Sequence, residues 1–122
     1  MKKILIVDDS TTIITLLSYM LIDYFGKDSV EIIQAKDGAD ALFALQDNEI
    51  ELVFLDIMMP VIDGNSVAKY IHSRELDLET IIITANLDKE VITSLGKIGF
   101  KNFLPKPIHT DRLETLLKKI EL

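Results

Sequence analysis

Residues 52–64 read LVFLDIMMPVIDG, and this stretch holds the clearest strand of the chain. Four apolar residues, Leu52 to Leu55, precede Asp56, and an Asp-Gly pair that indicates a turn closes the stretch at Gly64. An uninterrupted apolar run of this length is typical of a strand covered on both faces, as in a parallel sheet. Burying a charge is unfavourable, so we expect the strand to end at Leu55 and the Asp56 carboxylate to emerge there.

Segments of two alternating kinds extend outward from this stretch. Short runs rich in β-branched residues predict strands at residues 4–7, 30–35, 52–55, 81–84 and 100–104. Apolar residues spaced three or four apart predict helices at residues 11–25, 38–47, 64–74, 88–97 and 110–120. Strict alternation implies parallel strands, and right-handed crossovers then place helices on both faces of the sheet. The fold class is therefore α/β, a doubly wound (βα)5 sheet.

Composition narrows the function classes. The chain of 122 residues is 48% hydrophobic and 27% charged, has no cysteine and carries a net charge of -7. Without cysteine, thiolate catalysis and zinc-thiolate sites are excluded. The basic residues are scattered, which argues against binding of DNA through phosphate contacts.

The chain shows no targeting or membrane segment. No apolar stretch approaches the roughly 20 residues of a membrane span, and two aspartates follow the short apolar run near the N-terminus. We therefore expect a cytoplasmic protein with no membrane insertion. Because no linker or repeat interrupts the pattern, we expect residues 1–122 to form a single domain.

Polar residues follow the predicted strands at the edge where an open α/β sheet binds its ligands. They are Asp8 and Asp9 after the first strand, Asp56 after the third, Thr84 at the end of the fourth and Lys106 after the fifth. Taken singly, each has a structural explanation: a helix lead-in capped by Ser10, a β-branched strand residue, a solvated loop lysine. Taken together, three carboxylates repel one another unless a cation lies among them. Oxygen ligands without His or Cys select Mg²⁺ or Mn²⁺.

A carboxylate beside a divalent ion, a hydroxyl and an ammonium suits phosphoryl transfer. Aspartyl phosphate is an established covalent intermediate. The chain has neither GxxxxGK[ST] nor GxGxxG, the glycine-rich loops that bind nucleotides. We therefore expect the phosphoryl group to arrive on a donor other than a nucleotide bound by this chain.

Four motifs resemble the receiver domain of bacterial two-component response regulators. They are VDDS at 7–10, FLDIMMPVIDG at 54–64, IIITA at 81–85 and KP at 106–107, and the resemblance spans residues 2–119. It implies a flavodoxin-like fold with strand order 2-1-3-4-5. It also implies a stand-alone, chemotaxis-regulator-like response regulator with no effector domain, phosphorylated by a sensor histidine kinase or a histidine phosphotransfer protein.

The resemblance assigns roles to residues of the predicted site. Asp56 would accept the phosphoryl group, and Thr84 and Lys106 would contact it. The metal ligands would be Asp8, Asp9, Asp56 and the backbone carbonyl of Met58. The remaining roles are phosphate binding by Met58 and Ala85, switching by Thr84 and Phe103, tuning of phosphoryl lifetime by Met58 and Asn86, and a cis Lys106-Pro107 bond.

Three positions depart from the usual pattern of the family. Phe103 stands where a tyrosine is common, so no hydroxyl is present to recruit a partner. Pro105 lacks an N–H, so its strand should be an unpaired edge. Met58 cannot polarise an attacking water, which predicts slow to moderate self-dephosphorylation. We expect His72 and His109 to face solvent.

Output remains open between two forms. The predicted fourth helix, fifth strand and fifth helix would bind a downstream protein after phosphorylation, or the phosphoryl group would pass onward in a phosphorelay. The chain would catalyse its own phosphorylation and dephosphorylation and would not be an enzyme acting on other substrates. The alternatives are a receiver fold that acts as an interaction module without phosphorylation, and a small-molecule phosphatase, which would need longer loops or a cap domain.

Overall fold

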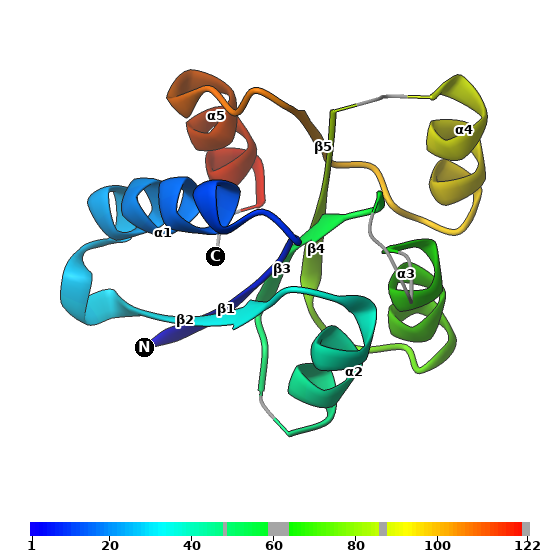
Figure 1. The fold of residues 1–122 in the computed structure, drawn as a ribbon, viewed down its shortest axis with the longest axis horizontal. Helices are drawn as coiled ribbons and strands as arrows, with labels where there is room; N and C mark the ends of the chain where they lie inside the picture. Colours follow the sequence, from blue (N-terminus) through cyan, green and yellow to red (C-terminus); the bar gives the residue numbers. More distant parts are fainter. Residues whose placement is uncertain (48, 59–63, 86–87, 121–122) are drawn as a thin grey trace.

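A computed structural model describes residues 1–47, 49–58, 64–85 and 88–120, which contain a five-stranded sheet (Figure 1). The strands are β1 (Lys2–Val7), β2 (Val30–Ala35), β3 (Leu52–Asp56), β4 (Glu79–Thr84) and β5 (Phe103–Pro105). Neighbouring strands are parallel, and their order is β2-β1-β3-β4-β5. The expected α/β fold and strand order are confirmed.

The helices cover both faces of the sheet. They are α1 (Thr11–Phe25), α2 (Gly38–Asp47), α3 (Gly64–Ser73), α4 (Lys89–Lys97) and α5 (Thr110–Ile120), with a short 3-10 helix, η1 (Lys27–Ser29), after α1. Helices α1 and α5 pack on one face, and α2, α3 and α4 pack on the other (Figure 1). No helix in the described part of the chain is long and apolar enough to cross a membrane.

The central strand β3 shows why its sequence is apolar without interruption. Leu52 and Phe54 belong to the core beneath α1 and α5, whereas Val53 and Leu55 belong to the core beneath α2 and α3. All four residues have no exposed surface. A strand between two layers of helix needs an apolar residue at every position, because successive side chains point to opposite faces.

Local chemistry sets the helix boundaries. Ser10 caps α1, since its Oγ accepts a hydrogen bond from the Ile13 N–H at 3.3 Å. Gly26 ends the same helix with φ of 96°, in the region that favours glycine. Asp88, expected inside α4, is its N-cap and accepts a hydrogen bond from the Glu90 N–H at 2.8 Å. Helix α3 ends at Ser73, one residue before the predicted end.

Several strand boundaries differ from the prediction. Strands β1 and β4 begin two residues earlier, at Lys2 and Glu79, because backbone pairing continues through polar residues that a hydrophobic pattern does not mark. The fifth strand begins at Phe103 and not at Phe100. The Phe100 N–H donates to the Leu95 carbonyl at 3.0 Å, so this residue is tied to the last turn of α4 and does not pair with β4.

Two further residues bear on the site. Asp56 is the last residue of β3 and is 2% exposed, so the expectation that the strand ends before it was wrong. Its backbone still pairs with β4 while its carboxylate turns to the edge of the sheet. Pro105 lies in β5, which pairs with β4 alone among the described strands, so the expected edge strand is confirmed.

Candidate functional site

The carboxyl ends of four strands deliver the predicted polar residues to one edge of the sheet. Asp8 directly follows β1, Asp56 ends β3 and Thr84 ends β4, while Lys106 directly follows β5. Val7 pairs with Leu55, so Asp8 and Asp56 leave adjacent strands side by side. Because the strands are parallel, their carboxyl ends lie on the same side of the sheet. Residues that are far apart in the sequence therefore meet there.

Asp8 is fully buried and held by backbone contacts. Its N–H donates to the Ala35 carbonyl at 3.0 Å, which continues the pairing of β1 with β2. Its Oδ1 accepts a hydrogen bond from the Ser10 N–H at 2.9 Å. Its Oδ2 lies 2.8 Å from the Lys106 ammonium as an ion pair, and a carboxylate oxygen has a second lone pair. That oxygen therefore retains capacity for a further ligand.

Asp56 is held in a similar way. The Met58 N–H donates to its Oδ1 at 2.9 Å, and the Lys106 Nζ lies 3.2 Å from its Oδ2. Burial raises the pKa of the Asp56 carboxyl above its ordinary value, and the nearby Asp8 charge raises it further. The Met58 hydrogen bond and the Lys106 charge oppose these effects without cancelling them. The ionised Asp56 carboxylate is therefore disfavoured in the folded protein, and a further positive charge nearby would stabilise it.

Lys106 bridges the two buried carboxylates. Its side chain is 17% exposed, and its Nζ contacts an oxygen of each aspartate. Burial lowers the pKa of Lys106, but its close contacts with Asp8 and Asp56 outweigh burial and raise the pKa above 10.5. The Lys106 N–H donates to the Thr84 carbonyl at 3.0 Å, and the Lys106-Pro107 peptide bond is cis. The loop that carries the lysine is thus tied to the end of β4.

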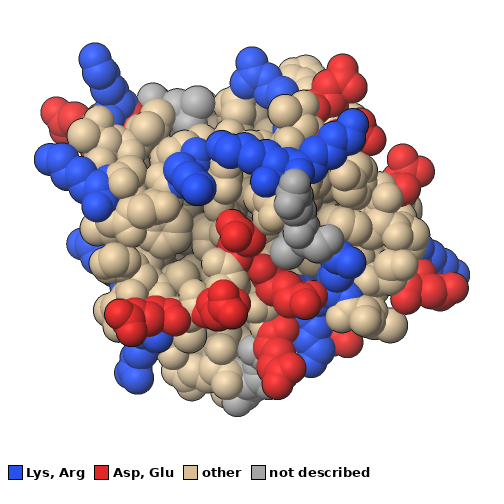
Figure 2. Space-filling model, turned by 180° about the vertical axis from the view of Figure 1, so that it is seen from behind, with Lys and Arg blue, Asp and Glu red and all other residues tan. Residues whose placement is uncertain are grey.

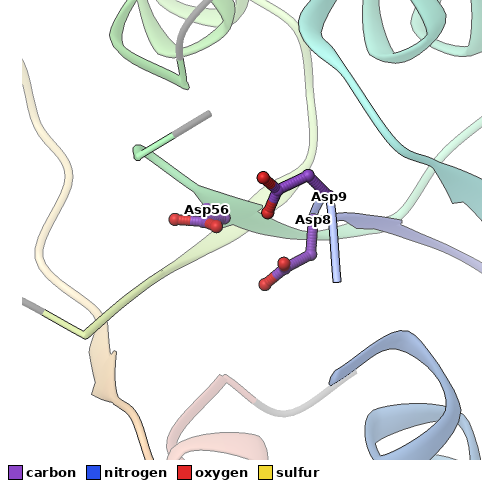
Figure 3. A group of neighbouring side chains, drawn as sticks. All are labelled: Asp8, Asp9 and Asp56. Carbon is purple, nitrogen blue, oxygen red and sulfur yellow. The ribbon is translucent and has the colours of Figure 1, made fainter. Parts of the chain in front are cut away.

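Three carboxylates form a group that could hold a metal ion. Oxygens of Asp8, Asp9 and Asp56 lie within 4.8 Å of one another, and the three side chains extend toward the same side (Figure 3). Asp8 and Asp56 are buried, whereas Asp9 is exposed. Three negative charges against the one positive charge of Lys106 leave an excess that suits a divalent cation. Oxygen donors alone favour Mg²⁺ or Mn²⁺ over zinc.

Met58 and Thr84 lie at the same ends of the strands as these carboxylates. Thr84 is 1% exposed, Ala85 is exposed, and Met58 is 61% exposed at the lip of the site. Phe103 is half-buried and packs against the core beneath α2 and α3. Asn86 lies outside the described residues. The two histidines, His72 and His109, are exposed, as expected.

Gly64 contributes to the site in a way that sequence reasoning missed. A Cβ placed on it would overlap the Asp56 carbonyl oxygen and the Ile57 Cα. Both are backbone atoms, so they could yield only if the end of β3 moved. The Asp-Gly pair had indicated a turn, but the requirement at Gly64 is space for the start of α3 against the backbone of Asp56. The Asp-Gly pair thus marked the position in the sequence, but it did not indicate the close approach of Gly64 to the backbone of Asp56.

Comparisons with known proteins agree with this geometry. The family model for the response regulator receiver domain matches residues 4–118. The chain is 33% identical over 120 residues to the alkaline phosphatase synthesis transcriptional regulatory protein PhoP of Bacillus subtilis, covering 98% of this chain and 48% of that protein. It is 38% identical over 109 residues to the response regulator GtcR of Aneurinibacillus migulanus, covering 88% and 43%. The chain thus spans about half the length of these curated relatives or less.

Solved structures share the fold along nearly the whole chain. The response regulator TrrA of Thermotoga maritima, in complex with Mg²⁺ and BeF, has a TM-score of 0.82 and 32% identity, covering 98% of this chain and 99% of that one. The chemotaxis protein CheY4 of Vibrio cholerae has a TM-score of 0.83 and 28% identity, covering 98% of each chain. A CheX-CheY-BeF3-Mg complex from Borrelia burgdorferi has a TM-score of 0.86 and 26% identity, covering 99% and 90%.

Proposed function

Because the chain belongs to the response regulator receiver domain family, we propose that it accepts a phosphoryl group on Asp56 from a sensor histidine kinase or a histidine phosphotransfer protein. The observation that carries this proposal is the pairing of two buried carboxylates with one lysine at the strand ends. Such an arrangement has no packing role that an apolar residue would not fill better. Its chemical use is to place a carboxylate nucleophile beside positive charge.

In the proposed reaction, a carboxylate oxygen of Asp56 attacks the phosphorus of a phosphohistidine. The O–P bond forms as the P–N bond breaks, and the imidazole leaves with the nitrogen lone pair and takes up a proton. Lys106 already contacts the Asp56 carboxylate and stabilises the phosphoryl oxygens once they arrive. Thr84 and Ala85, at the end of β4, and Met58 complete the phosphate-binding set. Asp56 of this chain is itself the group that is modified, and the phosphohistidine of the donor protein is the other reactant.

The cofactor in this proposal is Mg²⁺, with Mn²⁺ as a possible substitute. Asp8, Asp9, Asp56 and the backbone carbonyl of Met58 would hold it, which fits the clustered carboxylate oxygens and their excess of negative charge over the one ammonium of Lys106. When bound, the ion neutralises charge that builds up on the phosphoryl group. The TrrA structure, which contains Mg²⁺ and BeF, supports this assignment by relationship.

Phosphorylation would then shift a conformational equilibrium through Thr84 and Phe103. Phe103 begins β5 and is half-buried, so a change in its packing reaches the face formed by α4, β5 and α5. A downstream protein would bind this face, or the phosphoryl group would pass onward to another histidine. The Borrelia CheX-CheY complex is an example of a related protein bound to a partner.

We propose no DNA contact for residues 1–122 themselves. On the face shown in Figure 2, a band of basic side chains runs beside a group of acidic side chains, so negative charge borders the positive charge there. The net charge of -7 agrees with this. The curated relatives include a transcriptional regulatory protein of which this chain covers 48%. We place the protein in the cytoplasm.

Incubation with acetyl phosphate and Mg²⁺, followed by intact-mass measurement, tests the proposal. We expect one phosphate adduct on the wild type and on Asp23→Asn, a matched change in the last turn of α1, where Asp23 is exposed. We expect none on Asp56→Asn. A phosphate adduct that survives Asp56→Asn contradicts the proposal. No adduct on any variant favours the alternative of an interaction module that acts without phosphorylation.

The lifetime of the phosphoryl group has its own test. Met58 presents an exposed thioether at the site, which cannot orient a water as an amide can. We expect Met58→Asn to speed the decay of the phosphoprotein severalfold, measured by mass over time after the phosphodonor is removed. An unchanged rate contradicts the role of Met58. The same role for Asn86 is tested by Asn86→Ala.

A further inference from the structure

Ser10 connects the carboxylate group with the start of α1. It directly follows Asp9 and is the half-buried N-cap of the helix, with φ of -92° and ψ of 113°. Its N–H donates to the Asp8 Oδ1 at 2.9 Å. Its Oγ and its carbonyl oxygen accept hydrogen bonds from the Ile13 and Ile14 N–H groups at 3.3 and 3.1 Å. One residue therefore holds a buried carboxylate with its N–H and the first turn of a helix with its oxygens.

The N–H of Ser10 fixes the rotation of the Asp8 carboxylate. The backbone of Asp8 is already held, because its own N–H donates to the Ala35 carbonyl at 3.0 Å. With Oδ1 on the Ser10 N–H, the other oxygen, Oδ2, is turned toward Lys106 at 2.8 Å. This carboxylate lies beside the other two of the group (Figure 3). A change in the place of the Ser10 N–H would therefore change which oxygen the site presents to a cation.

The N-cap of α4 shows what a cap does when it is not connected to the carboxylates. The Asp88 side chain accepts a hydrogen bond from the Glu90 N–H at 2.8 Å, so it satisfies the first turn of its helix as Ser10 does. Asp88 does not belong to the group of carboxylates that could hold a metal ion. Loss of either cap should destabilise its own helix, but only loss of the Ser10 cap also frees the residue that holds Asp8.

We propose that Ser10 is a positioning residue for the cation site, because its cap on α1 keeps the Asp8 carboxylate in the orientation that binds Mg²⁺. Without the Oγ, the first turn of α1 opens more often, and residues 8–10 then adopt conformations in which the Ser10 N–H leaves Asp8. A cation that binds only the ordered form binds more weakly in proportion to the fraction of molecules that are ordered. This inference rests on the proposed function, in which Asp8, Asp9 and Asp56 hold Mg²⁺.

Titration of the full chain with Mg²⁺ alone, followed through its backbone amide signals by NMR, measures the dissociation constant without a phosphodonor. Ser10→Ala removes the Oγ and keeps the N–H. We expect it to raise the dissociation constant for Mg²⁺ by about fivefold, the factor that corresponds to a cap of typical strength. Ser10→Thr restores a hydroxyl acceptor, so its dissociation constant should lie within about twofold of that of the wild type.

The cap of α4 provides the matched control. Asp88→Ala removes a charge together with the cap, so it is compared with Asp88→Asn, which removes the same charge and keeps a capping oxygen. Ser10→Ala and Asp88→Ala should each lower the melting temperature, because each loses one cap. The two Asp88 variants should bind Mg²⁺ with equal affinity, since the α4 cap does not hold a carboxylate of the site.

Amide hydrogen exchange in the wild type measures the same coupling in the reverse direction. If an ordered first turn of α1 favours binding of Mg²⁺, then bound Mg²⁺ must favour the ordered first turn to the same extent. We therefore expect Mg²⁺ to slow exchange of the Ile14 N–H, which donates to the Ser10 carbonyl. Exchange of the Glu90 N–H, in the first turn of α4, should not change.

Each result that overturns the positioning role has its own meaning. Equal Mg²⁺ affinity of the wild type and folded Ser10→Ala means that the cap acts on the helix alone. A loss in Asp88→Ala relative to Asp88→Asn that equals the loss in Ser10→Ala means that any cap acts through overall stability. Weak binding that Ser10→Thr does not restore rules out the hydroxyl as the cause.

Failure of the proposed function gives a different result, because the wild type itself would then show no saturable shifts with Mg²⁺. In that case the role of Ser10 fails together with the cation site. If Ser10→Ala does not fold, the exchange of the Ile14 and Glu90 N–H groups in the wild type decides the question. Equal exchange of the Ile14 N–H with and without bound Mg²⁺ then overturns the positioning role.

Discussion

Buried polar groups at the two ends of the strands have different surroundings. We call the side where the strands end the carboxyl edge of the sheet, and the side where they begin the amino edge. At the carboxyl edge, Asp8 and Asp56 are buried with their charges, and each is held by a backbone N–H and by Lys106. At the amino edge, Asn102 is equally buried but neutral, and its Oδ1 has no partner within the described residues. A buried charge requires partners because its desolvation is large, whereas a neutral amide can remain unpaired at a smaller cost.

This difference shows where phosphate chemistry can occur in the molecule. The carboxyl edge concentrates three carboxylates around one ammonium, so it can bind a divalent cation and a phosphoryl group. At the amino edge the buried Asn102 is neutral, and no cluster of carboxylates that could hold a metal ion is found there among the described residues. The two ends of the strands therefore differ in buried charge, and substitutions at them should differ in sign and size.

Lys106→Met should have the largest effect. It leaves two buried carboxylates without their shared positive charge, and removal of one partner from such a set typically costs about 3 kcal/mol or more. The stabilisation by Lys106 is complete below its ordinary pKa of 10.5 and is lost only as pH rises through the raised pKa of the folded state, so the full loss appears at neutral pH. Urea unfolding of the wild type and of Lys106→Met at pH 7 measures this loss in the free energy of unfolding.

Lys101→Met is the matched control for this change, because Lys101 is exposed at the amino edge. We expect it to alter the free energy of unfolding by no more than about 0.5 kcal/mol. Equal effects of the two substitutions would mean that the ion pairs at the carboxyl edge add nothing.

Gly64→Ala should have the next largest effect. Its Cβ would overlap the backbone of Asp56 and Ile57, so the end of β3 must shift. We expect a loss of about 2 kcal/mol in the free energy of unfolding and a slower phosphorylation by acetyl phosphate, by roughly tenfold. In Gly96→Ala the new Cβ meets nothing within 4 Å, and this variant should gain about 0.5 to 1 kcal/mol from helix propensity. Normal phosphorylation of folded Gly64→Ala contradicts a positioning role.

Asp56→Asn should stabilise the protein in the absence of divalent cations. Burial and the Asp8 charge raise the pKa of Asp56 in the folded state, so folding takes up a proton and stability falls as pH rises through this range. Removing the charge should raise the free energy of unfolding at pH 7 by on the order of 1 kcal/mol. The gain should vanish below the ordinary value of 3.8. Thermal unfolding between pH 3 and 8 measures this difference, with Asp23→Asn as the control. If the Lys106 charge dominated, Asp56→Asn would instead lower the stability of the protein at pH 7.

Glu75→Gly at the amino edge should have the smallest effect. Glu75 has φ of 50°, a left-handed conformation in which glycine has no steric cost. We expect a gain of about 0.5 to 1 kcal/mol in the free energy of unfolding and no change in phosphorylation. The same substitution at Glu31, an exposed residue within β2, should instead destabilise the protein by a similar amount. Phosphorylation that responds to Glu75→Gly would mean that the two edges are not independent.

Much of the carboxyl edge could be predicted from the sequence because its residues follow apolar runs directly. Asp8, Asp56 and Thr84 each stand at the end of such a run, and parallel strands bring such ends together. The roles given to these residues remain proposals, whereas their position in the fold is confirmed. The amino edge gave no comparable signal, since Asn102 lies in a short polar stretch before β5, a strand whose start was misplaced.

The sequence by itself determined the alternation of strands and helices, the burial of β3 and the meeting of distant strand ends, because these follow from hydrophobic period and chain direction. Only the tertiary structure decided that Asp56 is buried, that Lys106 bridges two carboxylates and that Gly64 must lack a side chain. It also buried the Asn102 Oδ1, which has no hydrogen-bond partner among the described residues. Such features depend on distances between atoms of different segments, which no local pattern in one sequence records.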